Sequence, residues 1–180
     1  NTARSWLSVL EASYIVFLLQ PYHQNLNKRV VKMPKLYFYD TGLASAFLGI
    51  DNSSHFDAHP LKGALFETFV ISELLKFQTN RGFRPSLYFW RDKTGHEIDC
   101  LVENLATAIK SETAVLPIEI KSGTTIAEDY LKGVRYWQEL VGVTSSKAFV
   151  VYGGDLRQKR EAAEIVGWKE FFSHPGEFIR

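Results

Sequence analysis

Hydrophobic positions in the first part of the chain predict one short helix followed by two strands. The helix begins after Thr2 or Ser5 and carries the apolar residues Trp6, Leu7, Val9 and Leu10. The apolar run at residues 14–19 predicts a buried strand, and residues 36–39 predict a second one. Asp40 then predicts the cap of another short helix.

The segment between those two strands, residues 24–34, is polar and basic. Helix, strand, basic loop and strand is the order found in the second half of a winged helix, with the loop as the wing. We therefore predict a winged-helix-like segment over residues 1–50. Residues 51–60 show no periodicity and are interpreted as a linker.

The second block, residues 61–180, alternates helices and strands as an α/β domain does. Apolar periodicity predicts helices at 61–78 and 126–141. Strands are predicted at 87–91, 97–103, 115–121 and 149–152, with a weaker one at 108–110. The last strand follows a crossover helix and closes the sheet, so at least one parallel pair is expected. The predicted fold class is α/β, with a mixed sheet in αβββαβ order.

Composition narrows the class of protein further. The chain has 180 residues, of which 46% are hydrophobic, and no apolar stretch approaches the ~20 residues needed to cross a bilayer. A net charge of +1 is low for a DNA-coating protein, so any nucleic-acid surface must be local. The lone Cys100 and the lack of a signal peptide indicate the cytoplasm. Because the chain opens at Asn1 inside a helical pattern, we expect the C-terminal piece of a longer protein.

Charged residues occur where buried strands ordinarily exclude them. Alternation puts Glu119 and Lys121 on one face of their strand, just before Ser-Gly. Asp99 lies in the middle of its strand, although Asp is disfavoured there. The alternation assigns it to the face of Leu101 and Glu97, opposite Ile98, Cys100 and Val102. Buried charges of this kind need a partner or a metal ion.

These residues suit the hydrolysis of a phosphodiester, which needs charge stabilisation and an activated water. Asp99 and Glu119 would hold Mg²⁺ or Mn²⁺ with help from the carbonyl of Ile120, because such ions prefer oxygen ligands. Lys121 would orient the attacking water or stabilise developing charge. Glu67 in the preceding helix is a candidate third metal ligand, and Glu73 competes with it.

Other interpretations of the same residues stay open. Asp99, Glu119 and Lys121 could form a structural salt-bridge cluster or a decayed catalytic site. Glu67 could be a buried glutamate paired with a nearby Arg or Lys. The block from Leu61 onward could serve oligomerisation alone.

Basic residues of the first block could bind DNA phosphates through the wing: Arg4, Lys28, Arg29, Lys32 and Lys35. The alternatives are a solvated loop, or a winged helix that only couples two other modules. Trp90 and Tyr88 are expected to pack in the sheet. His96 could reach a phosphate, but we favour a surface residue beside a turn.

Longer strings carry a family resemblance. Asp99, followed twenty residues later by Glu119-x-Lys121, resembles the PD-(D/E)XK nuclease signature. Nearly the whole chain resembles the uncharacterised C-terminal domain of archaeal and bacterial AAA-type ATPases. The strings that carry this resemblance are PKLYFYDTGL, GALFETFVISELLK, LYFWRDKTGHEID, PIEIKSG and VVYGGD.

The resemblance implies an order of P-loop ATPase, winged helix and restriction-endonuclease-like domain in one parent chain. It implies DNA as the substrate and an auxiliary role for Lys132, which begins the helix after the E-x-K strand. No G-x-x-x-x-G-K-[ST] motif occurs, so this chain is expected to have no ATP site. The expected function is a metal-dependent DNA phosphodiesterase gated by the ATPase domain. The alternative is an inactive nuclease fold that serves the ATPase as a DNA-binding or interaction module.

Overall fold

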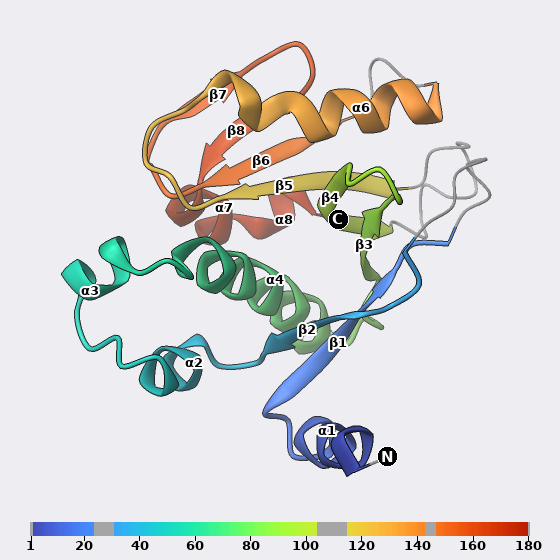
Figure 1. The fold of residues 1–180 in the computed structure, drawn as a ribbon. Helices are drawn as coiled ribbons and strands as arrows, with labels where there is room; N and C mark the ends of the chain where they lie inside the picture. The colour runs from blue at the N-terminus through green and yellow to red at the C-terminus, as the bar shows by residue number, and fades with distance from the viewer. Residues whose placement is uncertain (1, 24–30, 104–114, 143–146, 180) are drawn as a thin grey trace.

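A computed structural model of the chain describes residues 2–23, 31–103, 115–142 and 147–179. Its centre is a mixed sheet with the strand order β2-β1-β3-β4-β5-β6-β8-β7 (Figure 1). The strands are β1 Val16–Pro21, β2 Lys35–Phe38, β3 Leu87–Arg91, β4 Glu97–Glu103, β5 Val115–Lys121, β6 Phe149–Tyr152, β7 Arg157–Lys159 and β8 Glu164–Gly167. The helices are α1 Thr2–Ala12, α2 Thr41–Phe47, α3 Ser53–Ala58, α4 Lys62–Asn80, the 3₁₀ turn η1 Glu128–Leu131, α6 Lys132–Val141, α7 Trp168–Ser173 and α8 Pro175–Phe178.

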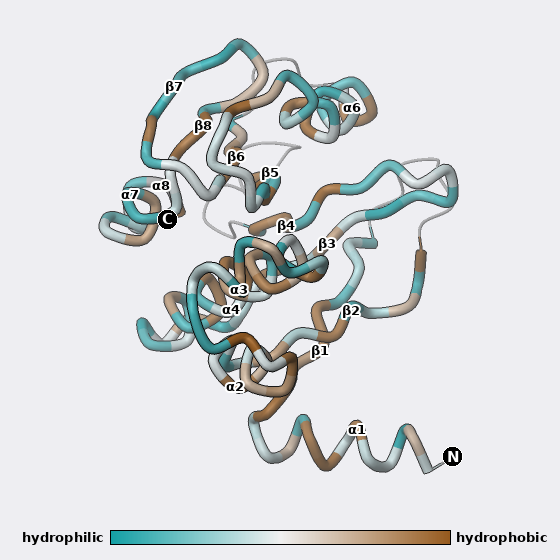
Figure 2. The backbone as a smooth tube through the Cα atoms, turned by 60° about the vertical axis from the view of Figure 1, so that its left-hand side comes forward, coloured by the Kyte–Doolittle hydropathy of each residue, from teal (hydrophilic) through white to brown (hydrophobic). Residues whose placement is uncertain are grey.

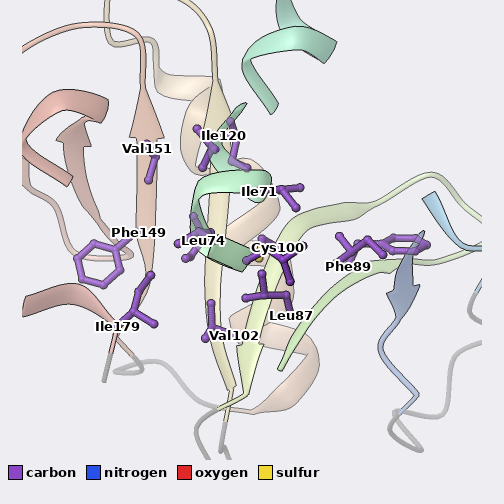
Figure 3. Close-up of a cluster of buried hydrophobic side chains, with 14 of the residues drawn as sticks. Ile71, Leu74, Leu87, Phe89, Cys100, Val102, Ile120, Phe149, Val151 and Ile179 are labelled. Carbon is purple, nitrogen blue, oxygen red and sulfur yellow. The ribbon is translucent and has the colours of Figure 1, made fainter. Parts of the chain in front are cut away.

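Helices cover both faces of the sheet, with α4 and α6 on opposite sides (Figure 1). The α4 side holds the largest core cluster, in which Ile71 and Leu74 of α4 lie against Cys100 and Ile120 of the sheet (Figure 3). On the other side, Trp137 of α6 contacts the fully buried Trp90. The sheet is therefore shielded from water on both faces, as parallel pairs usually require.

Most of the predicted second block is confirmed. Strands β3, β4, β5 and β6 have the predicted bounds, and β5 pairs with β6 in parallel. The prediction that β6 closes the sheet is wrong, because β8 pairs with it in parallel and β7 lies beyond β8. The interpreted linker contains helix α3. The weak strand candidate at 108–110 lies outside the described residues.

The first block extends the same sheet. β1 pairs antiparallel with β2 and parallel with β3, so the β1–β2 hairpin forms one end of the sheet. Asp40 caps α2 as predicted, because its Oδ1 accepts from the backbone N–H of Gly42 at 2.7 Å. Helix α1 projects away from the sheet (Figure 2). It has no buried residue, and Trp6 on it is 72% exposed. This arrangement does not confirm a winged-helix segment.

A β-bulge in β4 changes the faces that its residues occupy. Tyr88 pairs with Leu101 while Trp90 pairs with Ile98, so a single residue of β3 lies opposite both Asp99 and Cys100. Ile98 consequently packs with Leu101 beside α6, whereas Cys100 packs against α4. The predicted alternation, with Ile98 on the face of Cys100, is therefore wrong. The bulge leaves Asp99 at the point where the strand changes face.

None of the helices in the described ranges has the length and apolar character needed to cross a bilayer.

Candidate active site

Asp99 and Glu119 meet where β4 and β5 separate. The ladder between these strands ends at the pair Cys100 and Ile118. The next backbone N–H on that side belongs to Ile120, and it donates to Asp99 Oδ2 at 2.8 Å. The carboxyl groups of Asp99 and Glu119 hydrogen-bond to each other. The structure therefore brings together the two acidic residues that were predicted to share a metal ion.

Two further groups enclose Glu119, whose side chain is only 7% exposed. The ammonium of Lys121 lies 3.8 Å from Glu119 Oε1. Gly133, in the first turn of α6, packs so closely that a methyl group there would overlap Glu119 Oε1. A glycine is needed at that position for α6 to approach the carboxylate.

The electrostatics of the pair follow from burial and like charge. Burial and the neighbouring Asp99 raise the pKa of Glu119 to about 9. Burial and Glu67 also raise the pKa of Asp99. For Lys121, burial opposes the charge, but Glu119 and Asp99 outweigh it and raise the pKa. The folded structure therefore favours the protonated form of this pair of carboxyl groups more than water does.

Glu67 approaches the same region from α4, but two donors of β2 hold it. Its Oε1 accepts from Lys35 Nζ at 2.9 Å and from the hydroxyl of Tyr37 at 2.5 Å. Lys35 also forms an ion pair with Glu97. Glu73, the competing residue, pairs with Lys76 at 2.7 Å within α4 instead. Of the two helix glutamates, Glu67 is thus the one that is linked, through Lys35, to Glu97 at the start of β4.

An open cleft of about 620 Å³ is lined by Asp99, Glu119 and Lys121, and α6 contributes one wall with Lys132 and Arg135. The remaining lining residues are Gly95, His96, Glu97, Asp129, Gly133, Tyr136 and Glu139. Lys132, the auxiliary residue implied by the resemblance, therefore lies in the cleft with the predicted acidic residues.

The turn before β4 forms the rim of the cleft. Asp92, which is 3% exposed, accepts from Thr94 Oγ1 at 2.7 Å and from Tyr136 OH at 3.0 Å. Burial opposes its charge, but these hydrogen bonds lower the pKa of Asp92 to about 2. His96 stacks on Tyr136 with ring centroids 3.7 Å apart, and its Nδ1 lies 2.9 Å from Thr94 Oγ1. His96 is exposed beside the turn, as the favoured interpretation of a surface residue predicts, and Tyr136 and Thr94 contact its ring.

The ammonium Nζ of Lys35 forms ion pairs with Glu67 and Glu97 and does not lie on an open basic loop. Arg4 is exposed on α1, and Lys32 is exposed just before β2. Lys28 and Arg29 lie outside the described residues. Of the predicted nucleic-acid-binding residues that the structure describes, Lys132 lines the acidic cleft.

No group of three His, Cys, Asp or Glu side chains in the described ranges is arranged to hold a metal ion. The donors that fit a divalent cation are the Asp99 and Glu119 carboxyl groups. They already contact each other, so one cation could bind both.

Sequence reasoning missed Tyr37 and the true position of Lys35. A lysine and a tyrosine two residues apart share one face of a strand, and here that face meets Glu67. A charged residue beginning a strand in the apolar string KLYFY was the available signal. Asp129 and Arg135 were also missed, because nothing local distinguishes them from surface charges.

The fold and site define a mixed α/β protein with a cleft that concentrates acidic and basic side chains. Residues 62–171 match the domain of unknown function DUF4143, and the chain belongs to that family. Residues 1–54 match a second domain of unknown function, DUF8612. Uncharacterised proteins of Mycobacterium bovis and Mycobacterium tuberculosis are each 36% identical over 104 residues, or 57% of this chain. That match spans 22% of each relative's length.

Proposed function

We propose that the cleft is the active site of a metal-dependent phosphodiesterase that acts on DNA. One observation carries the proposal: two carboxyl groups twenty residues apart in sequence hydrogen-bond to each other beside a half-buried lysine. Placing two acids together in a buried position is unfavourable unless a proton or a cation joins them. The proposal also rests on the resemblance of the chain to PD-(D/E)XK nucleases, whose restriction-endonuclease-like core we assign to residues 61–180.

The Asp99 and Glu119 carboxylates would bind Mg²⁺ or Mn²⁺, and the carbonyl of Ile120 would assist. When bound, such an ion would supply charge stabilisation for the phosphoryl oxygens and a more acidic water. Asp99 is oriented for this role by the Ile120 N–H, and Gly133 allows α6 to close over Glu119.

Lys121 would act beside this pair. Its ammonium lies 3.8 Å from Glu119 and lines the cleft, so it can contact an incoming phosphate or orient a water molecule. The high pKa keeps it charged at neutral pH. Lys132 and Arg135 would bind the flanking phosphates of the DNA strand from the α6 wall.

The test compares wild-type protein with Lys121→Met on single-stranded, duplex and branched DNA in Mn²⁺. We expect cleavage to fall by about 10²-fold or more, while Mn²⁺ binding survives. Lys169→Met is the matched control, since Lys169 is 64% exposed and pairs with Asp155. Mn²⁺ binding without cleavage by the wild-type protein would refute the enzymatic role.

A second candidate is a nuclease fold that no longer cuts and serves as a DNA-binding or interaction module. It is favoured by the engagement of Glu67 with Lys35 and Tyr37, which occupies the glutamate predicted as the third metal ligand. This candidate predicts no Mn²⁺ binding by the wild-type protein.

The wider setting is proposed on resemblance alone. We infer that the chain is the C-terminal part of an AAA-type ATPase, with a winged-helix-like segment over residues 1–50, and that it works in the cytoplasm. The P-loop domain of the same parent chain would then be its partner. An ATP-dependent change in DNA cleavage by the full-length protein would support this setting, and identical cleavage with and without ATP would contradict it.

A further inference from the structure

Four acidic residues, Glu67, Glu97, Asp99 and Glu119, form an acidic cluster of two pairs. The two pairs have different neighbours. Glu67 and Glu97 share the ammonium of Lys35, and Arg91 Nε lies 3.6 Å from Glu97 Oε2. Asp99 and Glu119 form a second pair, with the Lys121 ammonium 3.8 Å from Glu119 Oε1. The first pair therefore already shares a cation of the protein, whereas the second is the pair proposed to hold the metal ion.

The position of Lys35 is well defined by its neighbours. Its side chain is 25% exposed, and the ammonium lies 5.4 Å from the centroid of the Phe89 ring. Tyr37, two residues along β2, donates to the same Glu67 oxygen that Lys35 contacts. That oxygen has two donors already and is closed to a metal ion.

Many phosphodiesterases with clustered carboxylates hold two divalent ions about 3.5–4 Å apart. An ammonium group is a compact positive charge that satisfies carboxylate oxygens in a similar way. We propose that Lys35 is a built-in cation that takes the place of a second metal ion, so that the site binds a single divalent ion between Asp99 and Glu119. Lys35 is on this account a positioning residue, supplied by the β1–β2 hairpin. The inference rests on the proposed metal site.

The experiment counts Mn²⁺ ions bound per chain at saturation, by equilibrium dialysis with detection of free Mn²⁺ by electron paramagnetic resonance. We expect one ion for the wild-type protein and two for Lys35→Met, because the variant removes the ammonium that Glu67 and Glu97 share. Adding Glu97→Gln to that variant should return the count to one. Lys62→Met is the matched control and should keep one ion, since Lys62 is 24% exposed, much as Lys35 is, and pairs with Asp57 outside the cleft.

The outcomes separate this inference from the proposed function. Two ions on the wild-type protein, or one ion on folded Lys35→Met, would overturn the role of Lys35 and leave the metal site standing. No ion on the wild-type protein would overturn both. If circular dichroism shows that Lys35→Met does not fold, the single variant Glu97→Gln tests the role of Lys35. It should bind one ion with unchanged affinity, and a loss of that ion would refute the built-in cation.

Discussion

Glu119 is a buried carboxyl group that lies against a second one. Its pKa is raised from 4.5 to about 9 by burial and by Asp99, so the folded protein holds the proton more tightly than the unfolded chain. The stabilisation from that proton is complete below pH 4.5 and is lost as pH rises to about 9.

Glu119→Gln should therefore remove this pH dependence, because an amide resembles the protonated acid and cannot lose the proton. We expect the variant to unfold at a higher temperature than wild-type protein at pH 8 and at a similar temperature at pH 4.5. Thermal melts across this range measure the difference. Glu73→Gln, which changes a surface glutamate paired with Lys76, should follow the wild-type curve. If the melting temperature of Glu119→Gln changed with pH in parallel with the wild-type value, the raised pKa of Glu119 would be contradicted.

Gly133 provides a second test at the scale of single residues. Gly133→Ala should push Glu119 out of position and weaken Mn²⁺ binding, although alanine favours the helix itself by roughly 1 kcal/mol. Gly63→Ala is the matched control, because Gly63 is also helical and the nearest atom to its added methyl is Ser122 Oγ at 3.9 Å. Calorimetric titration with Mn²⁺ compares the two. Equal affinities would show that the close approach of α6 has no role in binding.

Among elements, the turn between β3 and β4 depends on one buried carboxylate. Asp92→Ala would leave the N–H groups of Thr94 and His96 and the hydroxyl of Tyr136 without their acceptor. We expect a loss of about 3 kcal/mol in the free energy of unfolding, measured by urea denaturation. Asp92→Asn keeps one acceptor oxygen and should cost clearly less. If both variants matched the wild-type stability, the turn would not depend on this side chain.

The same elements show what sequence could and could not predict. The long apolar periodicity of α4 and the buried runs of β3 to β6 predicted these elements well, because each buries most of one face in the core. Strand β7, with the sequence RQK and two exposed residues, carries no such signal. The bulge in β4 was equally invisible, since it arises from pairing with β3 and not from any residue of β4 alone.

The bulge in β4 also limited how well the site could be predicted, because it lies at Asp99. Asp99, Glu119 and Lys121 were found from their unusual positions in strands, and strict alternation sufficed for the two residues of β5. Alternation failed around Asp99, where the extra residue turns the strand. The contacts of Lys35 and Tyr37 with Glu67 were not predicted, because these residues are 30 or more positions from Glu67 in the sequence. Local patterns contain no information on such contacts.

At the scale of the whole molecule, a bound divalent ion should couple the site to global stability. Mn²⁺ that binds only the folded state at 100 times its dissociation constant adds about 2.7 kcal/mol. We expect Mn²⁺ to raise the melting temperature of wild-type protein and of Lys121→Met, because lysine is not a ligand. Asp99→Asn should lose the effect. An equal rise in the melting temperature of Asp99→Asn would show that the ion binds elsewhere.

The most direct measurement is the anomalous diffraction of a crystal soaked in Mn²⁺. The account predicts one strong peak within about 2.0–2.3 Å of carboxylate oxygens from both Asp99 and Glu119, with Lys35 still in contact with Glu67. A soaked crystal that diffracts well but shows no peak there, or shows its peak between Glu67 and Glu97 instead, would contradict the account.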